Sequence, residues 1–266
     1  HRIKGGIERR FKKYGLRPRG MANRACKYKK TDFSGNPIEK AYMIGFRLGD
    51  LNVYNLKNIV QVRCSSTIRQ QISLIRKLFS NYTVPKTRKS LDKKYKIPKT
   101  DIVCLLNKSF SFLIPKEDKI PNWILKDRTL FFSFFAGYAD AEGCFYFHKP
   151  GKSGKTKIAG FEIQTQQKNI IWQLWKNAQK HGVIAPLPKI SVKAGYQRPN
   201  GNKNNKDMWR IEVARKDSLW RLVHFLEPYM KHGNKLKRMK EVKENLILRN
   251  FIPYSRPINL SVPLPA

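Results

Sequence analysis

Two short apolar segments, residues 43–50 and 135–143, repeat one pattern and constrain the fold more than any other feature of the chain. Each carries small residues four positions apart, namely Gly45 and Gly49, and Gly137 and Ala141. Residues four apart lie on one face of a helix, and small side chains on a shared face let two helix backbones approach closely. The pattern therefore predicts two helices that pack against each other.

Each apolar segment also ends in an acid, Asp50 in the first and Glu142 in the second, and a β-rich run follows. If the helices pack together, these two acids lie side by side at the helix ends. Two carboxylates at short range repel unless a proton or a cation lies between them. In a chain as basic as this one, the pair favours a divalent metal ion at a nucleic-acid phosphate.

The charge of the chain limits its partners. Its 55 Lys and Arg residues against 18 Asp and Glu residues give a formal net charge of +37. A field of this sign favours polyanions, and a hydrophobic content of 41% is sufficient for a packed core. No apolar run has the length of a membrane-spanning helix, and the four Cys residues contain no CxxC pair. We therefore expect a nucleic-acid partner and no membrane partner.

The spacing of Asp50 and Glu142 suits a duplicated unit of roughly a hundred residues. Apolar periodicity predicts that each unit has the order helix-strand-strand-helix-strand-strand-helix. We divide the chain into a basic N-terminal arm, a first repeat, a linker, a second repeat and a C-terminal tail, at residues 1–38, 39–120, 121–129, 130–250 and 251–266. Three basic or Gly-rich segments are expected to be loops that contact phosphates: 85–99, 149–157 and 193–206.

With both motifs in place, the chain resembles the monomeric, two-motif LAGLIDADG homing endonucleases over residues 39–250. The segment FAGYADAEG is a close match to the family motif. The segment MIGFRLGDL is a looser match, with Leu51 where the family usually has Gly and Leu48 where it often has an acid. The resemblance implies an α+β fold of two pseudo-symmetric αββαββα halves. These halves would pack through the motif helices, and each would carry an antiparallel saddle-shaped sheet.

The resemblance also implies a function, namely site-specific cleavage of double-stranded DNA with Mg²⁺. The sheets would lie along the major groove, with the acids beneath the central minor groove, and both strands would be cut to leave short 3′ overhangs. Asp50 and Glu142 match the metal-binding acids, and Asp140 matches an earlier, structural acid. Two or three divalent ions are expected, with one shared between the two acids. A single chain with two halves would act as a monomer on a long asymmetric site.

Further site residues come from matching the two repeats. Lys108 and Lys216 follow the last strand of their repeats and are candidates for electrostatic support of the scissile phosphates or for orienting water. Because lysine is abundant in this chain, they could also be solvated or contact phosphate elsewhere. Ser66 in the first repeat, and Gln166 or Gln167 in the second, end the second strand and could support the groups that contact the metal. Polar residues that alternate on one sheet face are expected to contact bases: Gln61, Arg63, Ser65, Tyr146, His148, Glu162 and Gln164.

Two other functions remain open for this sequence. A protein of the same fold could act as an intron RNA maturase or as a nucleic-acid-binding protein that does not cut, with intron RNA as a further partner. A basic structural RNA protein would leave the duplication unexplained. An acid at both motif ends favours the nuclease, because a pure binder has no need for the pair. We expect an intracellular, intron-encoded protein of an organelle (mitochondrion or chloroplast) or of the prokaryotic cytoplasm, and not a secreted one.

Overall fold

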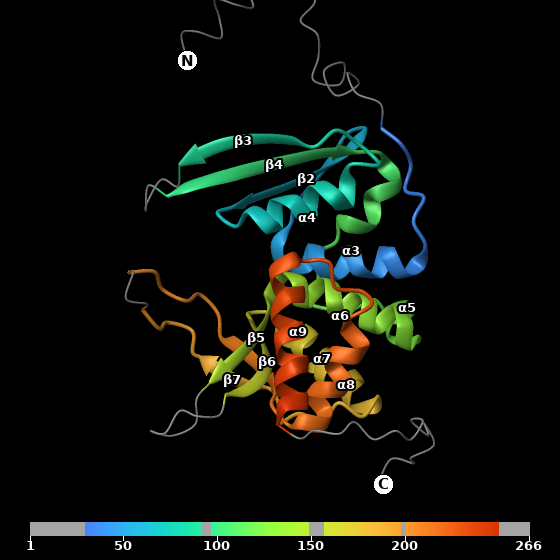
Figure 1. The fold of residues 1–266 in the computed structure, drawn as a ribbon. Coiled ribbons are helices and arrows are strands. Elements are labelled where there is room, and N and C mark those ends of the chain that lie inside the picture. Colours follow the sequence, from blue (N-terminus) through green and yellow to red (C-terminus); the bar gives the residue numbers. More distant parts are fainter. Residues whose placement is uncertain (1–29, 92–96, 149–156, 198–200, 250–266) are drawn as a thin grey trace, which may run out of the picture.

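The computed structural model describes residues 30–91, 97–148, 157–197 and 201–249. Two similar halves lie one above the other, and the helices α3 (Pro37–Asp50) and α6 (Arg128–Glu142) run between them (Figure 1). These helices are the two apolar segments with the repeated small residues. Residues 1–29 of the predicted N-terminal arm and all of the predicted C-terminal tail lie outside the described residues, while the last two residues of the arm already belong to α3. Most of the predicted loop at 149–157 also lies outside the described residues.

Each half contains one four-stranded antiparallel sheet. The first sheet has the order β1-β2-β4-β3, formed by Asn52–Leu56, Ile59–Ser66, Pro98–Leu106 and Lys86–Leu91. The second has the matching order β5-β6-β8-β7, formed by Gly143–His148, Ile158–Thr165, Met208–Val213 and Lys189–Val192. The identical strand orders confirm the predicted duplication and the α+β class.

Helices complete each half. In the first half they are α4 (Arg69–Phe79) and the 3-10 helix η1 (Lys108–Leu113), and in the second half α7 (Lys168–Lys180) and α8 (Lys216–Leu226). The order in both halves is therefore αββαββα, with η1 in the last position of the first half. The short helix α5 (Asn122–Leu125) lies within the predicted linker, and α9 (Gly233–Leu248) follows the second repeat. Among the described residues, no helix is both long and apolar enough to cross a membrane.

One prediction about the strands is wrong. Residues 85–99 were expected to form a basic loop, but most of its described part is strand. Strand β3 pairs with β4 from Lys86 opposite Val103 to Leu91 opposite Pro98. Because β3 is an edge strand with almost every side chain exposed, its sequence shows no alternation between buried and solvated residues.

The motif helices begin and end at clear local signals. The Asn36 side chain accepts a hydrogen bond from the Glu39 amide at 2.9 Å at the start of α3, and Pro37 follows in the first turn. At the start of α6, Asp127 accepts from the Leu130 amide at 2.8 Å. Both helices end where the backbone becomes extended, at Leu51 and Gly143, so each acid is the last helical residue before a strand.

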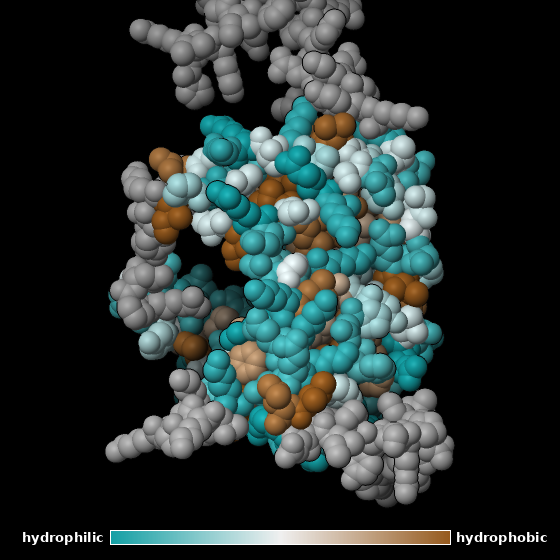
Figure 2. All heavy atoms as spheres, viewed as in Figure 1, coloured by the Kyte–Doolittle hydropathy of each residue, from teal (hydrophilic) through white to brown (hydrophobic). Residues whose placement is uncertain are grey.

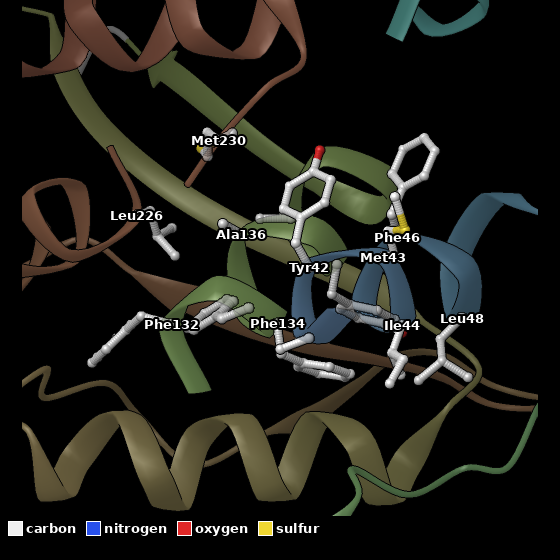
Figure 3. Packing of buried hydrophobic residues seen from close by; sticks show 14 of the residues in the cluster. Tyr42, Met43, Ile44, Phe46, Leu48, Phe132, Phe134, Ala136, Leu226 and Met230 are labelled. Carbon is white, nitrogen blue, oxygen red and sulfur yellow. The ribbon is translucent and has the colours of Figure 1, made fainter. Parts of the chain in front are cut away.

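The close approach of α3 and α6 depends on glycine. A Cβ atom added to Gly45 would overlap the carbonyl oxygen of Phe134, and one added to Gly137 would overlap that of Tyr42. The two contacts are reciprocal, as expected for a pseudo-twofold axis between the helices. Large buried side chains of both helices, among them Tyr42 and Phe134, surround this crossing (Figure 3). The halves therefore share one continuous core.

Candidate functional site

The structure brings Asp50 and Glu142 together at the ends of the crossed helices. A Cβ atom on Gly49, the residue before Asp50, would lie 3.1 Å from Cγ and 3.3 Å from Oε1 of Glu142. The same Cβ atom would overlap that of Ala141. Helix ends that meet through these small residues leave no room to separate the two acids. Their proximity is thus a consequence of the glycine contacts at the centre of the crossing.

Burial makes the charged form of both acids unfavourable. It raises the pKa of Asp50 to about 6, with repulsion from Glu142 as the second cause, while Lys235, a hydrogen bond from Gln71 and then Lys116 act in the opposite direction. Burial also raises the pKa of Glu142, against the attraction of Lys235 and Lys116. The acid pair therefore favours a bound proton or cation, as two carboxylates at a metal site do.

Sequence reasoning missed the two lysines that lie beside the acids, Lys116 and Lys235. Lys116 follows Pro115 near the end of the first repeat, and Lys235 lies in the first turn of α9. The Lys235 ammonium group donates hydrogen bonds to the carbonyl oxygens of Ala139 at 2.9 Å and Ala141 at 2.8 Å, at the end of α6. A cation at the negative end of a helix is electrostatically favourable. No spacing in the sequence distinguishes these lysines from the many others.

Lys108 and Lys216, the lysines predicted to support cleavage, do not lie beside the acids. Lys108 Nζ donates to Asn55 Oδ1 at 2.5 Å and to the Leu56 carbonyl at 2.8 Å, at the end of β1 remote from Asp50. Lys216 donates to the carbonyl of Arg249, just after α9, at 3.0 Å. The position of Lys108 follows from the antiparallel order of the strands. The end of β4 lies opposite the beginning of β2, away from the site.

A cavity of about 360 Å³ opens beside Glu142, and residues of both halves line it. Lys116 and Gly49 come from the first half, and Gln164 and Gln166 from the second. Gln167 also lines the cavity, but its Oε1 atom accepts a hydrogen bond from the Tyr138 hydroxyl at 2.7 Å. In the first half, the Ser66 hydroxyl accepts from the Ile68 amide at 3.0 Å. Among Ser66, Gln166 and Gln167, the residues that end the second strands, Gln166 is the one for which no such contact is described.

Asp140 lies inside the protein and supports the site without belonging to it. Its Oδ2 atom accepts hydrogen bonds from the Tyr42 hydroxyl at 2.6 Å and from the amides of Lys231 at 2.7 Å and His232 at 3.1 Å. Burial raises the pKa of Asp140, and these hydrogen bonds oppose the shift. The contacts join α3, α6 and the segment that leads to Lys235. This arrangement fits the structural role that the family motif implies for Asp140.

The first sheet presents the polar face predicted from its alternation. Gln61, Arg63 and Ser65 lie on the solvated side of β2, while Val62 and Cys64 are buried on the other side. Arg63 is exposed, and the Ser65 hydroxyl hydrogen-bonds the carboxylate of Asp101 on the neighbouring strand. This face lies on the side of the sheet opposite the core, and its side chains are accessible to a large ligand.

In the second sheet, two of the predicted contact residues belong to a network within the protein. The Tyr146 ring lies over Gly160, where a side chain would overlap it, and its hydroxyl donates to Glu212. Arg210 forms ion pairs with both acids: its Nε atom lies 2.9 Å from Glu162 Oε2, and its Nη2 atom lies 2.8 Å from Glu212 Oε2. Sequence reasoning missed Arg210 and Glu212, which come from β8. The network holds the acidic side chains of this face in fixed places.

The remaining predicted contact residues of the second half are placed as follows. His148 is exposed at the end of β5 and lies 6.1 Å from Tyr146 between ring centres. Gln164 is half-buried on β6 and lines the cavity beside Glu142. The described parts of the predicted loop 193–206 form a connection that is closed by a bridge between Gln197 and Lys203.

Figure 2 shows a hollow between the two halves, on the left of that view.

The donor set at the helix ends suits a hard divalent cation. Mg²⁺ is usually held by one or two carboxylates and completes its coordination with water and substrate phosphates. Asp50 and Glu142 supply that number, and burial raises the pKa of both acids despite the two nearby lysines, so a bound cation would favour their charged forms. In the part of the chain that the structure describes, no three His, Cys, Asp or Glu side chains converge on one point.

No protein-family model matches this chain, and no curated protein matches it in sequence. Solved structures do match it. The homing endonuclease I-WcaI bound to its DNA recognition sequence has a TM-score of 0.55 and 18% identity, with 84% of this chain and 95% of that chain covered. The I-LtrWI LAGLIDADG homing endonuclease bound to target DNA has a TM-score of 0.50 and 12% identity, with coverages of 81% and 92%.

A third solved structure of similar fold is full-length DUF199/WhiA from Thermatoga maritima. Its TM-score is 0.50 and its identity 13%, and the match covers 85% of this chain but 65% of that chain. At these identities the three likenesses concern the fold.

Proposed function

We propose that this chain, which has the fold of LAGLIDADG homing endonucleases, is a site-specific double-stranded DNA endonuclease. One observation carries the proposal, namely that two half-buried acids meet at the ends of the crossed helices with two lysines close by. A binding protein gains nothing from a pair of carboxylates whose charges are disfavoured by burial. A phosphodiesterase uses the pair to hold cations at the scissile phosphates.

Asp50 and Glu142 would hold the ions, and we propose two or three Mg²⁺ ions with one shared between the acids. Bound Mg²⁺ would stabilise charge on the phosphate in the transition state and activate a water for attack. Lys116 and Lys235 bring positive charge to the same place, which favours a phosphate there and offsets part of the repulsion between the acids. Lys235 is held by two carbonyls, and Lys116 lines the cavity.

The sheets would supply binding and sequence discrimination. Arginine and glutamine can pair with guanine and adenine edges in the major groove, so Gln61 and Arg63 suit direct contact with bases. In the second half, Glu162 and Glu212 are hydrogen-bond acceptors and suit bases that present an amino group. Because the two faces carry different side chains, we propose a long asymmetric target for a monomer. Cleavage across the minor groove to leave short 3′ overhangs is part of the same proposal.

The biological setting is also a proposal, and it rests on the resemblance to homing endonucleases. We propose an intron-encoded intracellular protein of an organelle or of a prokaryotic cytoplasm, with intron RNA as a second partner.

The alternative is a nucleic-acid-binding protein of this fold that does not cut, or an intron RNA maturase. The net charge of +37 and the similarity of the fold to WhiA both suit this function. The acid pair supports the endonuclease over the alternative, because a protein that only binds has no need of it.

One experiment tests the choice between them. The purified full chain is incubated with a randomised plasmid library and Mg²⁺, and the broken ends are sequenced. A recurrent long site with short 3′ overhangs is expected, and digestion without Mg²⁺ should yield none. Binding to a defined DNA or RNA without any break would favour the alternative.

On the recovered site, we expect Glu142→Gln to abolish cleavage and to leave DNA affinity nearly unchanged. The amide keeps the shape of the side chain but removes the negative charge that would hold the cation. The control is Glu241→Gln, which removes a carboxylate paired with Arg238 on the surface of α9. Cleavage by Glu142→Gln at the parental rate would refute the role of the acid.

A further inference from the structure

Arg47 is an unusual residue for the middle of a buried helix crossing. It lies three residues before Asp50 in α3, and its side chain is 4% exposed. The equivalent position in α6, counted from Gly45 and Gly137, is Ala139, so the packing itself does not require a long charged side chain there. A buried charge is costly unless hydrogen bonds satisfy it. Hydrogen bonds must therefore stabilise the buried guanidinium group of Arg47.

The guanidinium group of Arg47 joins two segments of backbone. Its Nε atom donates to the carbonyl of Leu113 at 2.9 Å, and its Nη1 atom donates to the carbonyl of Leu51. Leu51 directly follows Asp50 and caps the end of α3. Leu113 is the last residue of η1. Hydrogen bonds from a charged donor are about twice as strong as neutral ones, so this is a firm link between the two segments.

The second segment leads directly to Lys116. Only Ile114 and Pro115 separate Leu113 from that lysine, and the proline ring restricts the backbone of this short connection. Fixing the Leu113 carbonyl therefore limits where the Lys116 ammonium group can lie. Lys116 lines the cavity beside Glu142, and its charge attracts both acids. Arg47 thus fixes the backbone next to Asp50 through Leu51, and the backbone that leads to Lys116 through Leu113.

We propose that Arg47 is a positioning residue for cleavage, which fastens the end of α3 carrying Asp50 and the segment carrying Lys116 to a single guanidinium group. The inference rests on the proposed function and deepens it. The second half achieves the same end differently, because Lys235 itself binds the carbonyls at the end of α6. In the first half, Arg47 makes the corresponding contact with a carbonyl at the end of α3.

The test uses the full chain with Arg47→Met, which fills a similar volume without a donor, and Arg215→Met as the control. Arg215 forms an ion pair with Asp217 on the surface at 3.2 Å. For Arg47→Met we expect DNA affinity close to the parental value and single-turnover cleavage slower by about tenfold to a hundredfold, because a small misplacement of reacting groups has effects of this size. Arg215→Met should cleave normally.

A second readout does not depend on activity. In the metal-free proteins, hydrogen–deuterium exchange of the amides in residues 108–116 should be faster in Arg47→Met than in the parent, and unchanged in Arg215→Met. Arg47→Lys, which keeps the charge but has one donor group to place, should fall between the two in both measurements. If the parent cuts no DNA, the proposed function fails, while the exchange result still tests the anchoring.

Three results would overturn the inference. One is a folded Arg47→Met protein that cleaves at the parental rate. Another is slow cleavage with no change in exchange over residues 108–116. The last is loss of the fold in both Arg47→Met and Arg47→Lys, as judged by thermal melting, which would assign Arg47 a structural role alone.

Discussion

At the scale of single residues, repulsion between the two acids of the site destabilises the folded protein. Asp50 and Glu142 lie half-buried beside each other, because the helix ends that carry them meet through small residues. Lys116 and Lys235 relieve only part of the repulsion. A divalent cation bound between the acids would remove the remaining repulsion. Functional sites commonly reduce stability in this way.

Removal of one acid should therefore stabilise the metal-free protein. The pKa of Asp50 is 3.8 in the unfolded reference and about 6 in the fold, so the folded state holds this proton more tightly. The contribution of Asp50 to stability is then fully present below pH 3.8 and is lost as the pH rises through about 6. We expect Asp50→Asn to increase the free energy of unfolding by about 1–3 kcal/mol at pH 7.5.

The measurement is urea denaturation in EDTA at several pH values. The increase in the free energy of unfolding caused by Asp50→Asn should become steadily smaller as the pH falls toward 4. With Mg²⁺ present, the parent should gain stability and the variant should gain less, because ligand binding stabilises the state that binds it. A variant that is less stable than the parent at pH 7.5 would contradict the proposed repulsion.

The lysines offer a direct comparison between sequence and structure. We expect Lys116→Met and Lys235→Met to slow single-turnover cleavage by about a hundredfold, because each removes a cation next to the proposed phosphate site. Lys108→Met should leave the rate near the parental value, since Lys108 binds the far end of β1. Thermal melting separates these effects from loss of the fold. Slow cleavage by Lys108→Met together with fast cleavage by Lys116→Met would instead support the catalytic role that the sequence predicts for Lys108.

The acids could be predicted from sequence because a local motif fixes them. Each is the last residue of an apolar helix with small residues on one face, so the helix crossing determines where it lies. Lys116 and Lys235 could not be predicted, because each reaches the site from a segment outside both motifs. Arg210 and Glu212 were missed for a similar reason, since β8 lies beside β6 only after the sheet has formed.

At the scale of elements, the crossing of α3 and α6 is the central contact of the fold. Gly45 and Gly137 each lie against a carbonyl oxygen of the opposite helix, and the Ser133 hydroxyl donates to the Ile38 carbonyl at 2.6 Å. The helices are thus joined backbone to backbone, with almost no side-chain layer between them. The position of every site residue on either helix depends on this contact.

Substitution of either glycine should separate the helices. We expect Gly45→Ala and Gly137→Ala each to lower the free energy of unfolding by about 1–3 kcal/mol or more, because the added methyl group overlaps rigid backbone. The control is Gly233→Ala at the start of α9, where a Cβ atom meets nothing within 4 Å. That change should be neutral or slightly stabilising. Urea denaturation of the three variants measures the difference, and tolerance of Gly45→Ala would contradict the close approach.

Elements with one buried face were predictable from their periodicity. The bounds of β2, β6 and α9 follow the alternation and the helical stripe in the sequence. Strand β3 was not predictable, because it lies at the sheet edge and is held by main-chain pairing with β4. A strand without a buried face leaves no pattern in its side chains.

At the scale of the whole molecule, charge governs how the protein meets its partner. A chain with a net charge of +37 should bind DNA through many phosphates, and each neutralised phosphate releases counterions. We expect log Kd to rise with log salt with a slope of about 0.9 per phosphate contact, for roughly six to ten contacts. Fluorescence anisotropy with labelled target DNA between low and physiological salt measures this slope. A nearly flat dependence would contradict an interface dominated by phosphate.

The glycine crossing has a consequence for redesign. Because main-chain atoms join the two halves, assembly places no demand on the residues that face outward from the sheets. The recognition surface can thus be altered at positions such as Gln61 and Arg63 while the joint is left intact. A half transplanted from another protein, by contrast, needs a small residue in its motif helix that lies opposite a carbonyl oxygen of the partner helix. New targets are therefore more accessible by resurfacing this scaffold than by exchanging its modules.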